Sequence, residues 1–143
     1  MNDVITINED DTSIISTSDP IILDGIYNIN IKQGATFTLS FNWKDKQGRL
    51  KDLTDYSAAM KIRTDYDSAT SLVSLTSGSG ITLGGTAGTV ICKIAPAETT
   101  TLSNDDFPAV YDFELTNTVD ATIVLRLLEG KVTFDQNVTR VDV

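Results

Sequence analysis

Hydrophobic and polar side chains alternate with a period of two along several short stretches of this chain. In residues 36–43, Phe37, Leu39, Phe41 and Trp43 alternate with threonine, serine and asparagine. A period of two places successive side chains on opposite faces of a β-strand. The stretch is therefore predicted to be a strand with one buried face and one solvent-exposed face, and its aromatic side chains are predicted core residues.

The same alternation recurs further along the chain. In residues 57–63, Ala58, Met60 and Ile62 alternate with more polar residues. Further strands are predicted within residues 20–31, 71–75, 80–83, 89–95, 109–117 and 121–143. The last of these regions is predicted to supply two strands, with Ile123, Leu125 and Leu127 alternating with Val124, Arg126 and Leu128, and with Gly130 marking a bulge or bend between them.

The connections between these stretches carry turn residues. Leu50 and Leu53 are expected to anchor the charged connection that follows Trp43. The glycine-rich residues 78–88 predict hairpin turns, because no phosphate-binding pattern is present and no helix follows. A helix is predicted only within residues 95–103, where it spans about one turn and places Leu102 inward.

These elements add up to about seven to nine short strands, a profile typical of an all-β fold. We predict an antiparallel immunoglobulin-like β-sandwich formed by residues 25–143, preceded by an acidic N-terminal arm formed by residues 1–24. Tyr111 enters an alternating strand and is compatible with the tyrosine corner of immunoglobulin domains.

Charge is distributed unevenly along the chain. The formal net charge is −9, and the first 24 residues contain six acids and no bases. Binding to nucleic acid requires clustered lysine and arginine, so we expect no nucleic-acid partner. We also expect no membrane partner, because no apolar run approaches the length of a membrane span and the N-terminus carries acids where a signal peptide has basic and apolar residues.

Reactive side chains are scarce. The chain contains no histidine and a single cysteine, Cys92, within an apolar run. The commonest general base and a zinc site of the usual type are therefore missing, and the acidic groups do not match a calcium-loop pattern. We predict a protein that is not an enzyme and that has no catalytic residues, cofactor or metal site.

Two features are candidate subunit contacts. The arm carries four isoleucines, Ile14, Ile15, Ile21 and Ile22, among its acids. A solvated tail gains nothing from such residues, whereas a segment that docks on a neighbouring subunit buries them. The alternatives are a disordered tail and an integral strand of the protein's own sandwich.

The second feature is a set of arginines beside apolar strand faces, namely Arg63, Arg126 and Arg140. They are interpreted either as outward residues that pair with acids across the sheet or as residues at a subunit contact, where arginine is enriched.

Several short motifs between Gly34 and Arg140 resemble small β-sandwich proteins encoded among the virion genes of tailed bacteriophages. They are Gly34-x-Thr36-Phe37, the strand ending at Trp43, the sequence DLTDY at 52–56, Ala59-Met60-x-Ile62-Arg63, Tyr111-Asp112-x-x-Leu115, Leu128-Glu129-Gly130-x-Val132 and Val138-Thr139-Arg140.

The resemblance implies a non-enzymatic virion structural protein, assembled in the cytoplasm of the host bacterium. It implies a position in the tail, collar or baseplate, where several copies contact other virion proteins and bridge the tail to a fibre. A head-decoration protein and a carbohydrate- or surface-binding module are the alternatives. The arm lies outside the matching region.

Overall fold

The computed structural model describes residues 4–8, 14–16, 25–44 and 49–139, with side chains described from residue 25 onwards. The strands are β1 (Val4–Asn8), β2 (Ile14–Ser16), β3 (Ile29–Lys32), β4 (Phe37–Lys44), β5 (Tyr56–Arg63), β6 (Val73–Ser77), β7 (Gly80–Leu83), β8 (Thr89–Ile94), β9 (Ala109–Asn117) and β10 (Val124–Asp135). The helices are the single-turn α1 (Pro96–Thr99) and the 3₁₀ turns η1 (Gly85–Ala87) and η2 (Asn104–Asp106). The predicted single helical turn is confirmed.

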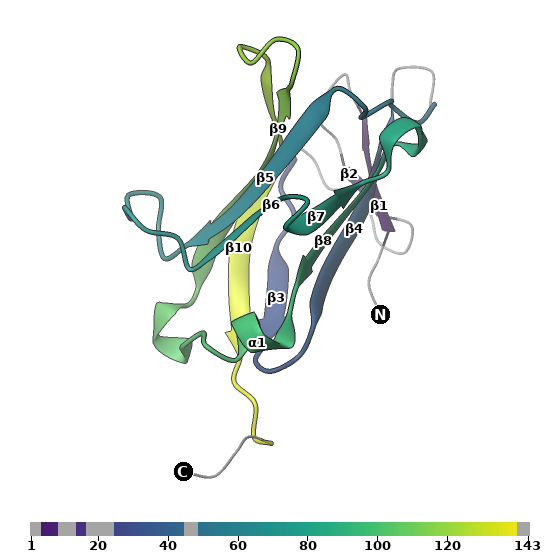
Figure 1. Ribbon diagram of the computed structural model, residues 1–143. Helices are drawn as coiled ribbons and strands as arrows, with labels where there is room; N and C mark the ends of the chain where they lie inside the picture. The colour runs from purple at the N-terminus through teal and green to yellow at the C-terminus, as the bar shows by residue number, and fades with distance from the viewer. Residues whose placement is uncertain (1–3, 9–13, 17–24, 45–48, 140–143) are drawn as a thin grey trace.

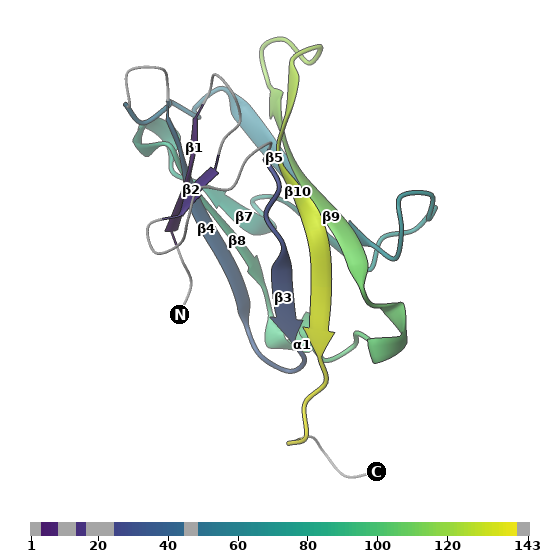
Figure 2. The same ribbon diagram turned by 180° about the vertical axis from the view of Figure 1, so that it is seen from behind.

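The strands form two facing layers around one core (Figure 1). The hydrogen-bonded order is β2-β1-β4-β8-β7-β6-β5-β9-β10-β3, and a short parallel contact between β6 and β7 joins the layers. The strand β3 runs parallel beside β10 (Figure 2), and β1 runs parallel beside β4. All other pairs are antiparallel. The predicted all-β sandwich is confirmed, with ten strands described in place of the predicted seven to nine.

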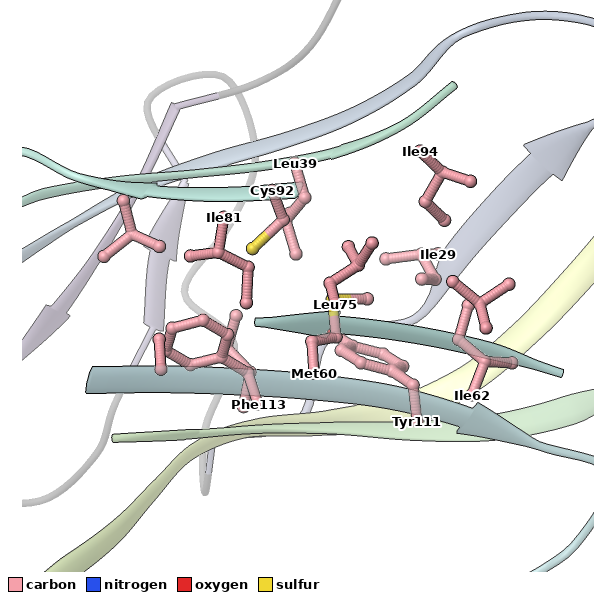
Figure 3. Packing of buried hydrophobic residues seen from close by; sticks show 14 of the residues in the cluster. Ile29, Leu39, Met60, Ile62, Leu75, Ile81, Cys92, Ile94, Tyr111 and Phe113 are labelled. Carbon is pink, nitrogen blue, oxygen red and sulfur yellow. The ribbon is translucent and has the colours of Figure 1, made fainter. Parts of the chain in front are cut away.

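Aromatic side chains from opposite layers meet in the core. Phe41 of β4 and Phe113 of β9 are both buried, and their rings pack edge to face with centroids 5.0 Å apart. Trp43 and Tyr111 are also buried, whereas Phe37 is only partly buried. Aliphatic side chains and the Cys92 thiol fill the space between the layers (Figure 3). The alternation predicted for these strands therefore identified the buried faces.

The buried Thr99 hydroxyl links the turn between β3 and β4 to α1 by hydrogen bonds. Thr99 is fully buried, its hydroxyl donates a hydrogen bond to the Ala35 carbonyl at 2.9 Å, and it accepts one from the Gly34 amide at 3.0 Å. Leu102, just beyond α1, is buried as predicted. A buried hydroxyl with donor and acceptor both used costs little to bury, so this contact closes one end of the sandwich.

The C-terminal region differs from its prediction. Residues 124–135 form one continuous strand, β10, rather than two, and the register against β9 shifts between Arg126 and Leu128. Leu127 and Leu128 are both buried, while Ile123 is 41% exposed. The bulge is therefore at Leu127 and not at Gly130, because one extra residue at that point reverses the inward and outward positions that precede it.

Gly130 instead permits a close backbone approach. A Cβ atom at this position would lie 2.5 Å from the Tyr27 carbonyl oxygen. That oxygen accepts a hydrogen bond from the Tyr111 hydroxyl, which reaches it from the neighbouring strand β9. A tyrosine corner bonds to backbone a few residues upstream, whereas Tyr111 bonds 84 residues upstream, so the tyrosine-corner prediction was wrong.

The connection between β4 and β5 is anchored at one of the two predicted leucines. Leu53 is buried in the core, whereas Leu50 is 44% exposed and forms a bridge to Lys44. Only Leu53 therefore acts as the expected anchor. The glycine-rich segment forms one of the predicted hairpins, between the antiparallel strands β7 and β8, with Gly88 at a φ angle of 66°. The turn at Gly78, where φ is 87°, is not a hairpin, because the strands β6 and β7 that it joins pair in parallel.

The N-terminal arm contributes two strands to the sheet of its own chain. Residues 4–8 pair in parallel with β4, and residues 14–16 pair antiparallel with residues 5–7. This pairing corresponds to the integral-strand alternative for part of the arm. The predicted domain boundary after residue 24 and the docking of the arm on a neighbour stay predictions.

The core position of Phe41 predicts a large loss of stability on truncation. We expect Phe41→Ala to lower the free energy of unfolding by about 3–5 kcal/mol, because it removes a buried ring and its contact with Phe113. Ser40→Ala, on the opposite face of β4, should change it by less than about 0.5 kcal/mol. Urea titration measures both values, and equal effects of the two variants would show that the faces of β4 are assigned wrongly.

Candidate functional site

A charged cluster centred on Arg126 lies on the outer face of β9 and β10. The Arg126 Nε atom lies 3.5 Å from Asp112 Oδ2 and 3.9 Å from Glu114 Oε2, and its Nη1 atom donates a hydrogen bond of 3.2 Å to Glu129 Oε1. Three carboxylates thus surround one guanidinium. The contacts match the interpretation of Arg126 as an outward residue paired with acids across the sheet.

The bulge at Leu127 creates this arrangement. In a regular strand, residues 126 and 129 would project from opposite faces. The extra residue lets both leucines at 127 and 128 turn into the core and leaves Arg126 and Glu129 together on the outer face. Glu114 is the direct cross-strand partner of Arg126, and Asp112 is that of Glu129. The charged cluster and the irregularity in β10 therefore have one cause.

Arg63 and Arg126 line the same surface groove, which has a volume of about 360 Å³. The groove also contains Lys61 and the carboxylates of Asp65 and Asp112. Arg63 donates a hydrogen bond of 3.3 Å to the Ser68 carbonyl and so supports the loop after β5. The structure therefore brings two of the predicted arginines together, although both make contacts within the chain.

The turn between β9 and β10 is a second surface feature, and sequence reasoning missed it. It projects beyond the sandwich at the end opposite α1 (Figure 1). Val119 is 82% exposed and Val124 is 49% exposed. We call residues 117–124 the hairpin tip. Its signal in the sequence is a set of β-branched apolar residues around Asn117 and Asp120, where a turn exposes them to solvent.

Hydrogen bonds fix the shape of the hairpin tip. The Asn117 side-chain oxygen accepts hydrogen bonds from the Val119 and Asp120 amides, both at 2.9 Å. The Asp120 carboxylate accepts from the Thr122 hydroxyl at 2.6 Å and from its amide at 3.1 Å, and these bonds lower the pKa of Asp120. The Thr118 amide donates to the Asp55 carbonyl at 2.8 Å. The tip thus presents its apolar side chains from a preorganised turn.

The Cys92 thiol and the Tyr111 side chain are buried in the core. Burial raises the pKa of the Cys92 thiol to about 12. Burial, followed by the nearby Tyr27, Cys92 and Glu129, also raises the pKa of Tyr111. A thiol with this pKa holds almost no thiolate at neutral pH and is a poor nucleophile.

No group of three or more histidine, cysteine, aspartate or glutamate residues is placed to hold a metal ion within residues 25–44 and 49–139 or the two arm strands. In the same parts of the chain, no helix is long and apolar enough to cross a membrane.

The remaining predicted contact residues belong to the arm and the C-terminus. Ile14 and Ile15 form part of β2, where their backbone pairs with residues 7 and 6 of β1. Ile21, Ile22 and Arg140 lie outside the described residues. Their assignment to a subunit contact stays a prediction.

Comparisons with known proteins identify no family. No protein-family model matches the chain, and no curated protein matches it. Among solved structures, the N-terminal domain of phage TP901-1 ORF48 aligns over 94% of this chain and 98% of its own chain, with 8% sequence identity and a TM-score of 0.47.

The charged cluster predicts a salt-dependent contribution of Arg126 to stability. We expect Arg126→Gln to lower the free energy of unfolding by up to about 1 kcal/mol at low ionic strength, because it leaves three carboxylates without their shared cation. The loss should disappear near 1 M NaCl, where the screening length falls to about 3 Å.

Arg63→Gln is the matched control, because Arg63 donates its hydrogen bond to a neutral group, the Ser68 carbonyl. Its effect should not depend on salt. Thermal unfolding at both salt concentrations measures the difference. If Arg126→Gln is neutral at low salt, the cluster does not stabilise the fold.

Proposed function

We propose that the protein is a non-enzymatic structural component of a bacteriophage virion. In this proposal it occupies the tail, collar or baseplate, assembles in several copies, and bridges the tail to a fibre or to a neighbouring virion protein. It uses no cofactor and acts by presenting surfaces held in place by a rigid core. The assembled protein resides in the virion, after assembly in the cytoplasm of the host bacterium.

One contrast carries this proposal. The Cys92 thiol is buried and the Arg126 guanidinium is paired with carboxylates, whereas apolar side chains project from the hairpin tip. An enzyme needs reactive groups that a substrate can reach, as at least one accessible base or nucleophile. A protein that binds other proteins needs exposed apolar groups with fixed positions, because ordering them beforehand lowers the entropic cost of association.

The strand order supports the immunoglobulin-like class. The adjacent strands β4, β8 and β7 form part of one layer, and β5, β9 and β10 form part of the other, as strands B, E, D and C, F, G do in immunoglobulin domains. This class serves many functions, so it does not select one. The motifs between Gly34 and Arg140 that resemble tailed-phage virion proteins select the virion role.

Two alternative functions, head decoration and carbohydrate binding, predict different features of the protein. A head-decoration protein would have the same fold and the same scarcity of reactive groups, so only its position in the particle differs. A carbohydrate-binding module needs exposed aromatic rings. Tyr66, at 76% exposure, is the one aromatic among the strongly exposed large apolar residues of the described chain. The buried positions of Phe41, Trp43 and Phe113 therefore favour an assembly role.

Gold labelling tests the proposal. Purified particles of the phage that carries this gene are labelled with a gold-conjugated antibody against the chain and imaged in negative stain. Particles from a phage with the gene deleted serve as the control. We expect gold on the tail, at the collar or baseplate. Gold on the capsid would establish the head-decoration alternative, and unlabelled particles that also lack the chain by mass spectrometry would contradict a virion role.

A further inference from the structure

The edge of β4 is a site for strand addition, and in this structure β1 occupies it. Five residue pairs align in parallel register, from Val4 with Ser40 to Asn8 with Lys44. The opposite edge of β4 pairs with β8. Without β1, the edge of β4 that faces away from β8 would present unpaired backbone groups. Such groups readily accept a strand from another chain.

The chain connection does not restrict β1 to its own β4. Two backbone hydrogen bonds fix the chain again at Gly25 and Tyr27, which pair with Glu129 of β10. Residues 17–24 connect Ser16 to this anchor, and eight residues reach at most about 30 Å. That distance is comparable to the diameter of a small domain. The arm can therefore reach the β4 edge of an adjacent copy when that edge lies within about 30 Å of the anchor.

An adjacent copy offers the same partner for β1. Exchange of identical elements between copies keeps every backbone pair that the closed monomer makes, so its cost is mainly that of association.

We propose that β1 is exchanged between copies of this chain, so that β1 of one copy completes the sheet of the next at β4. This inference deepens the multi-copy assembly proposed above and names its contact. The backbone pairing supplies affinity, in the manner of strand addition to a sheet edge. When copies are far apart, the arm closes its own sheet, and when they are held side by side, it closes a neighbour's.

Disulfide trapping between two variants, each with one added cysteine, tests the exchange in purified full-length protein that is concentrated enough to bring copies side by side. Thr6 and Asn42 are direct partners in the register. Adjacent strands lie about 4.8 Å apart, within the Cα separation that a disulfide spans. Tagged Thr6→Cys protein is mixed with untagged Asn42→Cys protein, oxidised at mild pH, and separated on a non-reducing gel. The native Cys92 is buried, with a pKa of about 12, and does not compete.

We expect a disulfide-linked heterodimer at a yield about tenfold or more above the matched control, because exchange holds the two thiols at a high effective concentration. The control mixes Thr6→Cys with Lys61→Cys, an exposed position on β5 that does not pair with β1. A yield equal to this control overturns the proposal.

A chain carrying both Thr6→Cys and Asn42→Cys tests the register itself. An intrachain disulfide in this chain, combined with a control-level yield in the mixture, would show that β1 stays on its own β4. No disulfide in either experiment would overturn the pairing on which the proposal rests. Both disulfide results are independent of where gold labels the particle. The disulfide experiments can therefore contradict strand exchange without contradicting the virion role, and gold labelling can do the reverse.

Discussion

The contact between Phe41 and Phe113 joins the two layers, and the rest of the structure is arranged around it. Each ring lies on the inward face of its strand, so burying both rings fixes which side chains of β4 and β9 enter the core. A slip of one residue in either strand would expose its whole apolar set to water. The outward side chains at Ser40, Asp112 and Glu114 are positioned by the same constraint.

The surface features follow from places where this regular alternation is interrupted. The bulge at Leu127 buries two consecutive leucines and leaves Arg126 beside Glu129 on the outer face. The hairpin tip exposes Val119 because the Asn117 side chain satisfies the turn's backbone amides. In both cases local backbone geometry, rather than an unusual residue, produces the exposed group. A protein built in this way can vary its contacts while its core stays unchanged.

The sequence predicted the faces of β4, β5 and β9, because each has one buried face and a strict period of two. It failed where the period changes. The extra residue at Leu127 turns Leu128 into the core, on the same side as Leu127, and nothing in the alternation marks that change. The sequence left two interpretations of Arg63 and Arg126 open, outward pairing with acids or a subunit contact. Their shared groove depends on the pairing of β5, β9 and β10, which one strand's sequence does not specify. The parallel pairing of β1 is likewise a long-range contact.

The proposed strand exchange requires that β1 can open separately from the core formed by the other strands of the sandwich. Native-state hydrogen exchange at increasing urea concentration tests this claim most directly, because local and global opening respond differently to denaturant. The account predicts that the amides of β1 exchange through openings that urea hardly affects. The amides of β9 should exchange only through global unfolding, which urea strongly promotes. Identical exchange free energies and urea dependence for β1 and β9 would contradict the account, because β1 would then open only when the core unfolds.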